Sequence, residues 1–306
     1  MSLSELASIQ GLNELEWGER LEFLGVSSEA FDPAAVIILP VPYEATVTYM
    51  RGTARGPRAI LEASAQIELY DDELDSEPYE VGTYTLPSLK LPDGDPKQAH
   101  SALRRAVAGL IGSGKFLILL GGEHSISAEP ILEHAARLGS SELSVLQLDA
   151  HADLRPEYGG TPYSHACVMH RVYEVVNLVQ VGTRSLTRLE RELIRSEHIR
   201  NVSAREMRSN DWIGHTLEAL GEHVYVTLDV DYFDPAVVPS TGTPEPGGGQ
   251  WEPTLELLRR VFEQRQVVGL DVVELAPIQG VVAPDFLVAK LVYKLIGYYS
   301  AGSRSR

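Results

Sequence analysis

The strongest constraint on this chain is a repeated alternation of short, continuously apolar runs with longer amphipathic stretches. The apolar runs carry Val, Ile and Leu at successive positions instead of at every second one. That pattern is typical of strands covered on both faces, as in a parallel sheet between helices. We therefore expect strands at Ala35–Val41, Phe116–Leu120, Leu143–Leu148, Leu178–Val181, His223–Leu228 and Val267–Val272.

The amphipathic stretches between these runs predict crossover helices, and strand–helix alternation predicts an α/β fold. The Pro/Gly-rich stretch Pro235–Pro253 follows a strand that ends in aspartates, so we interpret it as an active-site loop. The acidic stretch Asp71–Glu80 is interpreted as a solvated excursion. The expected helices are Pro57–Leu69, Pro96–Ile111, Ala128–Leu138, Ala166–Val176, Leu186–Ser196, Trp212–Leu220, Pro253–Gln264 and Pro284–Tyr299.

Charge and composition exclude some classes of binding partner. The 306 residues include 26 Lys and Arg against 43 Asp and Glu, a net charge of −17. This excess argues against nucleic acid as a partner and is compatible with a cationic small substrate. The N-terminus lacks the pattern of a signal peptide, and no run approaches the length of a membrane span. We expect a cytoplasmic protein with no membrane partner.

Side chains that bind metals or carry negative charge follow four of the expected strands. In open α/β sheets the carboxyl ends of the strands form the ligand-binding edge. We therefore expect these side chains to converge at one edge. They are His124 after the first such strand, Asp149, His151 and Asp153 after the second, Asp229 and Asp231 after the third, and Glu274 after the fourth.

The spacing of these residues favours metal binding. Asp149, His151 and Asp153 stand at i, i+2 and i+4, so in an extended chain they share one face. Two imidazoles and four carboxylates suit Mn²⁺, with Zn²⁺, Fe²⁺ and Co²⁺ as alternatives. Six ligands are too many for one catalytic ion with an open position. With bridging carboxylates they suit two ions about 3.5–4 Å apart.

Charge balance supports the same interpretation. Four ionised aspartates crowded into a buried site raise one another's pKa, and two divalent cations would neutralise them. A bridging hydroxide and Glu274 would then leave the pocket negative, which favours a cationic substrate.

Each motif also has a less specific interpretation. His124 alone would be a loop histidine, and the Asp229–Asp231 segment alone would be a turn with helix caps. The occurrence of all the motifs at successive strand ends favours the metal site. His165 alone would be a surface histidine, but its position just beyond the metal loop favours a functional role. Cys167, the single cysteine, is interpreted as structural because a nucleophilic thiol would need a neighbouring base.

Together these motifs resemble the ureohydrolase family, which includes arginase and agmatinase. The likeness extends from about Ala35 to Tyr299. It implies one arginase-like domain over residues 1–306 with an N-terminal extension at 1–33. It also implies a three-layer fold, with a mainly parallel sheet of about eight strands and helices on both faces. The motifs are GGEHS (121–125), DAHADLR (149–155), SHACVMHR (164–171), DVDYFDP (229–235), DVVELAP (271–277), PVPYEATVTYMRGTARGPRAI (40–60) and STGTPEPGGG (240–249).

The resemblance further implies a site with two Mn²⁺ ions. His165 matches the mobile catalytic histidine of the family, and Glu274 matches the glutamate that pairs with the guanidinium. Many agmatinases continue Pro-x-Tyr-Asp after this glutamate, whereas this chain has Pro277-Ile-Gln-Gly280, which puts the adjacent pocket wall in doubt. One ion would take His124, Asp149, Asp153 and Asp229, and the other would take Asp149, His151, Asp229 and Asp231, with Asp149 and Asp229 bridging.

The expected reaction is that of an agmatinase. A metal-bridging hydroxide would attack the guanidinium carbon of agmatine and release urea and putrescine. Asp231 would accept the proton of the hydroxide, and His165 would relay a proton to the leaving amine. The alternatives are a guanidinobutyrase, for which Arg155 would receive the carboxylate, an arginase, a formimino-amide hydrolase and a metal-binding homologue without turnover. The resemblance also implies a homo-oligomer, a trimer or a hexamer.

Overall fold

The core of the protein is an eight-stranded sheet in which every pairing between neighbouring strands is parallel. The computed structural model describes residues 12–26, 31–139, 142–209 and 211–304. The strand order is β3-β2-β5-β10-β9-β6-β7-β8. The strands are β2 (Val36–Val41), β3 (Thr83–Thr85), β5 (Phe116–Gly121), β6 (Leu143–Leu148), β7 (Asn177–Thr183), β8 (Arg200–Ser203), β9 (His223–Asp229) and β10 (Gln266–Val273).

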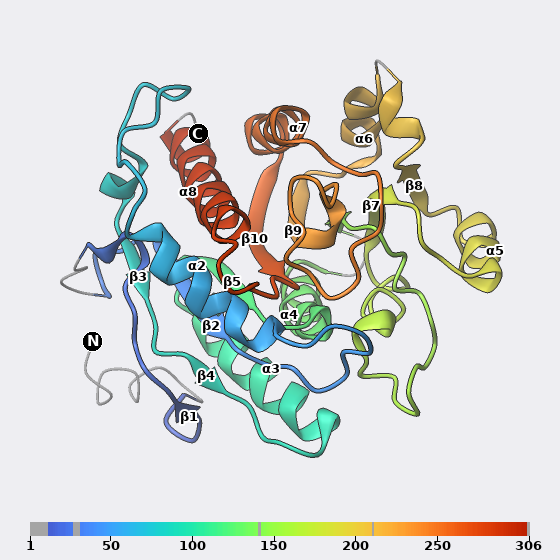
Figure 1. Ribbon diagram of the computed structural model, residues 1–306, viewed down its shortest axis with the longest axis horizontal. Coiled ribbons are helices and arrows are strands. Elements are labelled where there is room, and N and C mark those ends of the chain that lie inside the picture. The colour runs from blue at the N-terminus through green and yellow to red at the C-terminus, as the bar shows by residue number, and fades with distance from the viewer. Residues whose placement is uncertain (1–11, 27–30, 140–141, 210, 305–306) are drawn as a thin grey trace.

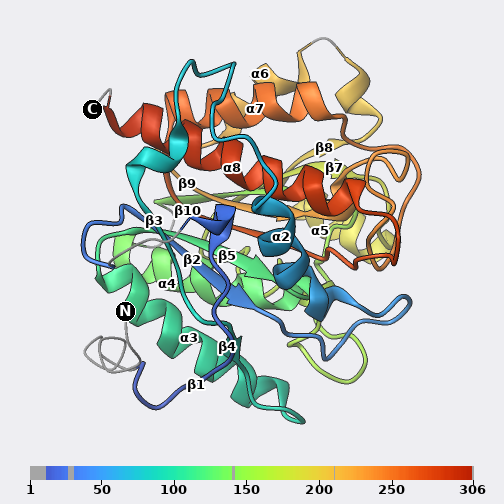
Figure 2. The same cartoon turned by 60° about the vertical axis from the view of Figure 1, so that its left-hand side comes forward.

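Helices cover both faces of this sheet (Figures 1 and 2). Ile38 and Ile118 pack in the cluster that contains residues of α2, α6, α7 and α8, whereas Ile37 and Leu117 pack with α3 on the opposite face. Successive residues thus alternate between two apolar layers, which explains the continuous apolar runs. The helices are α2 (Gly56–Ser64), α3 (Pro96–Gly112), α4 (Ala128–Leu138), α5 (Arg188–Ser196), α6 (Trp212–Ala219), α7 (Trp251–Gln264) and α8 (Ala283–Arg304).

The predicted three-layer α/β fold is confirmed. All six predicted strands are present, with ends that differ by at most two residues. The pattern missed β3 and β8, which are short strands at the two edges of the sheet and do not read as apolar runs. A separate pair, β1 (Glu16–Trp17) with β4 (Leu89–Lys90), is antiparallel. The predicted N-terminal extension at 1–33 stays a prediction, since 1–11 and 27–30 lie outside the described residues.

The predicted helix at Ala166–Val176 is wrong. A single 3₁₀ turn, His165–Cys167, is followed by irregular turns up to β7. The amides of Met169 and His170 donate to the carbonyl of Asp153 at 3.0 and 3.2 Å instead of bonding within a helix. The periodic apolar residues of this segment are nevertheless buried. Their spacing in the sequence therefore indicated burial correctly, although the segment is not a helix.

The interpretation of Asp71–Glu80 as a solvated excursion is wrong at its first residue. Asp71 is fully buried, and its carboxylate pairs with Nζ of Lys294 on α8 at 2.8 Å. The amides of Glu73 and Leu74 donate to the same carboxylate oxygen. The segment is therefore attached to α8 by a buried ion pair, while most of its other acidic side chains are exposed.

We expect Lys294→Met to lower the free energy of unfolding by about 3–5 kcal/mol, because it leaves the Asp71 carboxylate buried without its cation. Lys290→Met, one turn earlier on α8, is the matched control, since Lys290 is only half-buried. Urea denaturation monitored by circular dichroism measures the free energy of unfolding of both variants. Equal stabilities of the two variants would contradict a structural role for the ion pair.

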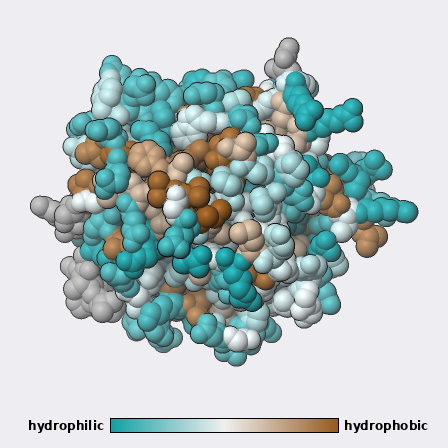
Figure 3. Space-filling model, in the orientation of Figure 1, coloured by the Kyte–Doolittle hydropathy of each residue, from teal (hydrophilic) through white to brown (hydrophobic). Residues whose placement is uncertain are grey.

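The surface shown in Figure 3 is mainly hydrophilic, with apolar groups gathered toward the middle of that face. The exposed large apolar side chains include Val282, directly before α8, and Phe286 in the first turns of that helix. No helix within the described part of the chain is long and apolar enough to cross a membrane.

Candidate metal centre and substrate cavity

The predicted site residues lie at the carboxyl ends of four strands that are neighbours in the sheet, β5, β10, β9 and β6. These strands end at Gly121, Val273, Asp229 and Leu148. Because the four strands are parallel and adjacent, the segments that follow them meet at one edge. The structure therefore brings the four motifs together, as the alternation of elements predicted.

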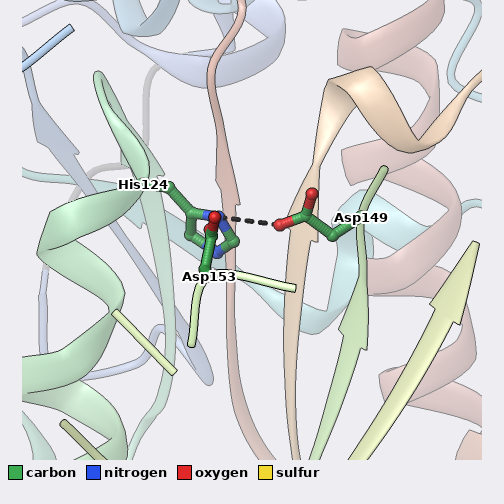
Figure 4. A group of neighbouring side chains, drawn as sticks. All are labelled: His124, Asp149 and Asp153. Carbon is green, nitrogen blue, oxygen red and sulfur yellow. Dashed lines mark ion pairs between the residues drawn. The ribbon is translucent and has the colours of Figure 1, made fainter. Parts of the chain in front are cut away.

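His124 lies at the centre of one group of ligand atoms (Figure 4). Its Nδ1 lies 3.0 Å from Oδ2 of Asp149, 3.1 Å from Oδ2 of Asp153 and 3.4 Å from Oδ2 of Asp229. All four side chains are at least nine-tenths buried. The ligand atoms of His124, Asp149 and Asp153 lie within 4.8 Å of one another, close enough to hold one metal ion.

His151 belongs to a second group of the same kind. Its Nδ1 lies 2.9 Å from Oδ2 of Asp231 and 3.6 Å from Oδ1 of Asp149. These three residues also offer ligand atoms within 4.8 Å of one another. Asp149 belongs to both groups, and its Oδ1 is the nearer oxygen to His151 while Oδ2 is the nearer to His124. This arrangement suits a carboxylate that bridges two ions.

The hydrogen bonds of His124 test whether a cation fits this cluster. The hydroxyl of Thr227 donates to Oδ1 of Asp271 at 2.7 Å, so Thr227 accepts from Nε2 of His124 at 2.9 Å. The Nε2 proton is thereby assigned, and Nδ1 is buried without a hydrogen-bond partner although carboxylate oxygens surround it. A nitrogen lone pair that faces several carboxylates is repulsive unless a cation lies between them. The donor set therefore fits a metal ion.

The pKa values of these side chains also indicate that the cluster needs a cation. Burial, together with the charge of Asp149, raises the pKa of Asp153 to about 7. Burial and the neighbouring aspartates raise the pKa of Asp229 well above its usual range. Burial alone would lower the pKa of His124, but the carboxylates around it outweigh burial and raise it. Crowded carboxylates take up protons when no other cation neutralises them, and divalent ions would replace those protons.

The backbone at this edge adopts two unusual conformations. Asp153 has a φ of +53° and Glu274 a φ of +66°, both in the left-handed region. Such conformations cost free energy and persist where surrounding contacts impose them. The amide of Glu274 donates to the carbonyl of Gly122 at 2.8 Å. A Cβ at Gly122 would lie 2.0 Å from the carbonyl oxygen of Tyr43, so only glycine fits there.

Glu274 is 7 % exposed and lies beside the first metal group. Its Oε1 accepts the backbone N–H of His124 at 2.6 Å. Burial raises the pKa of Glu274 well above its usual range, and a cation bound at its carboxylate would reverse that tendency. The segment 277–280, where the sequence departs from many agmatinases, is absent from the described lining of the cavity.

A cavity of about 340 Å³ opens onto the metal groups. His165 lies in its wall, and burial lowers the pKa of this histidine. Residues 242, 243 and 245 of the predicted active-site loop also line the cavity. Arg155 is the one arginine or lysine among the described lining residues, and its guanidinium lies 4.8 Å from the ring centre of Tyr158. Carboxylates outnumber it: Asp153, Glu190, Asp229, Asp231, Glu245 and Glu274 all line the cavity.

Four buried or half-buried residues that support the site were not singled out from the sequence. Thr227, which donates to Asp271, holds the ring of His124, and Thr46 contacts both His165 and Glu123. All four stand within or beside motifs that were recognised. Their positions within or beside these motifs were the available signal, but the partners that give them their roles lie far away in the sequence.

Comparisons with known proteins agree with this geometry. The Arginase family matches residues 34–297. The N(1)-aminopropylagmatine ureohydrolase of Synechocystis is 40% identical over 286 residues, covering 90% of this chain and 93% of that protein. The agmatinase of Pyrococcus horikoshii is 34% identical, covering 86% and 92%. The crystal structure of the agmatine ureohydrolase of Thermoplasma volcanium superposes with a TM-score of 0.84 at 26% identity and covers 99% of both chains. The chain therefore belongs to the arginase family.

Proposed function

We propose that this protein releases urea from a cationic guanidino amine of the agmatine type. As a member of the arginase family, it is a hydrolase of amidino carbon–nitrogen bonds. The observation that carries the proposal is the pair of buried ligand groups that share Asp149, located in a cavity whose wall also holds Glu274. This combination suits a substrate with a positively charged guanidinium.

Two Mn²⁺ ions fit the two groups. His124, Asp149, Asp153 and Asp229 would hold one ion, and Asp149, His151, Asp229 and Asp231 the other. When bound, such a pair makes hydroxide available near neutral pH. The chemistry of the donors, imidazole and carboxylate, is that of sites for Mn²⁺ and similar borderline-hard ions.

Glu274 would orient the substrate. Its Oε1 already accepts the His124 amide, which leaves Oε2 for the guanidinium. A charge-assisted hydrogen bond to an otherwise buried carboxylate is strong and directional. It would hold the guanidinium carbon beside the metal groups and would exclude substrates without that charge.

His165 and Asp231 would carry out the proton transfers. Because burial lowers its pKa, His165 is neutral near pH 7 and can take up a proton at one ring nitrogen and pass it to the leaving amine. Asp231 lies in the second metal group, where its carboxylate would accept a proton from the attacking water. Urea and a primary or secondary amine would be the products.

The relatives favour N(1)-aminopropylagmatine as the preferred substrate. Four relatives with this named activity are 34–40% identical to the chain, including the Synechocystis protein. Agmatine, which we expected from the sequence, is the second candidate because relatives named agmatinase are 33–34% identical. Both compounds are amines without a carboxylate, and the excess of carboxylates in the cavity suits both.

We expect the manganese-loaded protein to release urea from both amines with a kcat/KM about 10²-fold above that for arginine or 4-guanidinobutyrate, because an unpaired carboxylate in an acidic cavity is costly. A colorimetric urea assay over the four compounds measures this. Faster turnover of a guanidino acid would overturn the substrate class. Release of formamide from a formimino-amide, or bound metal with no turnover of any compound, would overturn the proposed reaction.

A further inference from the structure

The ring of His165 is in contact, at Nδ1, with the hydroxyl of Thr46, a residue 119 positions away in the sequence. Oγ1 of Thr46 accepts the backbone N–H of His165 at 3.0 Å and lies 3.1 Å from Nδ1 of its ring. One hydroxyl therefore contacts both the main chain and the side chain of the histidine. Nε2, the other ring nitrogen, has no hydrogen-bond partner among the described residues.

The orientation of this hydroxyl is set by Glu123, which is fully buried. Oε2 of Glu123 accepts the backbone N–H groups of Ala45 and Thr46, each at 2.6 Å. Oε1 accepts the hydroxyls of Thr46 at 2.8 Å and Ser125 at 2.6 Å. Four donors thus converge on this side chain, and the single proton of the Thr46 hydroxyl is one of them, directed to Oε1 of Glu123.

This arrangement determines which nitrogen of His165 carries a proton. Because the Thr46 hydroxyl donates to Glu123, its oxygen can only accept from the ring of His165. Nδ1 must then hold the hydrogen, and Nε2 keeps its lone pair. The hydroxyl of Ser164 also lies near Nδ1, but at 3.4 Å it is more distant.

We infer that Thr46 is a positioning residue that, together with Glu123, fixes His165 in the tautomer with hydrogen on Nδ1 and a free lone pair on Nε2. The inference rests on the proposed function in one respect, since it assigns His165 the proton transfer described above. In that role the histidine takes up a proton at Nε2 without first rearranging its own proton.

The same turn after β5 thus serves two parts of the site. His124 contributes to the first metal group, while the preceding Glu123 reaches the loop that contacts His165. The amide of Glu123 donates to the carbonyl of Tyr43 at 2.8 Å, which holds that loop against the turn. The absence of a side chain at Gly122 permits this approach.

Thr46→Val keeps the shape of the side chain and removes the hydroxyl, and Thr46→Ser restores it. For the manganese-loaded enzyme we expect Thr46→Val to lower kcat about 10–10²-fold, a part of what general acid–base catalysis contributes. KM should change by less than about twofold and the bound metal should stay constant, because Thr46 touches neither ligand group. Thr46→Ser should recover kcat to within about threefold of the original enzyme.

A second readout does not depend on turnover. In the protein labelled with ¹⁵N-histidine and loaded with diamagnetic Zn²⁺ in place of Mn²⁺, the resonances of His165 are assigned by comparison with His165→Asn. We expect the original protein and Thr46→Ser to show a protonated Nδ1 at pH 7.5, and Thr46→Val to show proton density moved to Nε2. This measurement reports the tautomer directly.

Thr46→Val with unchanged kcat, an unprotonated Nδ1 in the original protein, or Thr46→Ser as slow as Thr46→Val would each overturn the inference. Failure of the proposed function looks different. The original protein would then release no urea from any guanidino compound, while the NMR spectra would still decide whether Thr46 fixes the tautomer.

Discussion

Asp149→Ala should abolish metal binding and urea release together. Asp149 belongs to both ligand groups, and each of its oxygens lies close to a different histidine. We expect bound manganese to fall from two ions per chain to less than one. Urea release should fall on the order of 10³-fold or more, because the proposed hydroxide-generating centre would be lost. Elemental analysis after gel filtration and a urea assay on the same sample measure both quantities.

Two further variants provide comparisons for the metal content and the activity of Asp149→Ala. Asp231→Ala alters only the second group, so it should reduce the metal content by one ion. Asp234→Ala is the matched control, since the Asp234 carboxylate accepts the amide of Ala236 at 2.8 Å in a turn and lies outside the described lining of the cavity. It should keep both ions and the activity. An Asp149→Ala protein with two bound ions or full urea release would refute the shared-ligand arrangement.

Glu274→Gln should separate metal binding from turnover. The amide oxygen of glutamine can still accept the N–H of His124, so we expect both ions to remain. The guanidinium, however, loses the charge of its buried partner, and kcat/KM should fall about 10²–10³-fold, equivalent to the loss of a desolvated charge pair. Urea release against substrate concentration, with metal content determined in parallel, measures the effect.

A fall in metal content in Glu274→Gln would instead make this residue a support for His124. An unchanged kcat/KM with both ions bound would show that the guanidinium binds elsewhere in the cavity. Glu190→Gln provides a comparison within the same cavity, because the Glu190 carboxylate already accepts hydrogen bonds from the Leu154 amide and from Thr187.

The sequence predicted the sheet and the edge that carries the site because both depend on local patterns. A strand covered on both faces appears in the sequence as a continuous apolar run. Polar and metal-binding residues that directly follow such runs must meet at the carboxyl edge of the sheet. The order of the strands does not follow from local patterns. Nothing in the apolar run at Gln266–Val273 indicates that β10 pairs with β5 on one side and β9 on the other.

The wrong predictions share a physical cause, which is a partner distant in sequence. The spacing of apolar residues after His165 suggested a helix. However, the Asp153 carbonyl accepts hydrogen bonds from two backbone amides that would bond within such a helix. Asp71 lies in an acidic stretch and was assigned to solvent, yet Lys294, 223 residues later, pairs with it in the interior. The supports of the site, such as Thr46 and Asp271, escaped notice for the same reason.

The central place of β10 has a consequence for how the protein is made. A nascent chain that has left the ribosome only as far as β9 has β5 and β9 but lacks the strand that lies between them. The two halves of the sheet then expose open inner edges, which favours slow folding and aggregation. Synthesis must pass residue 273 before these halves can join, so a chain truncated shortly before β10 should accumulate as insoluble material and not as a partly active enzyme.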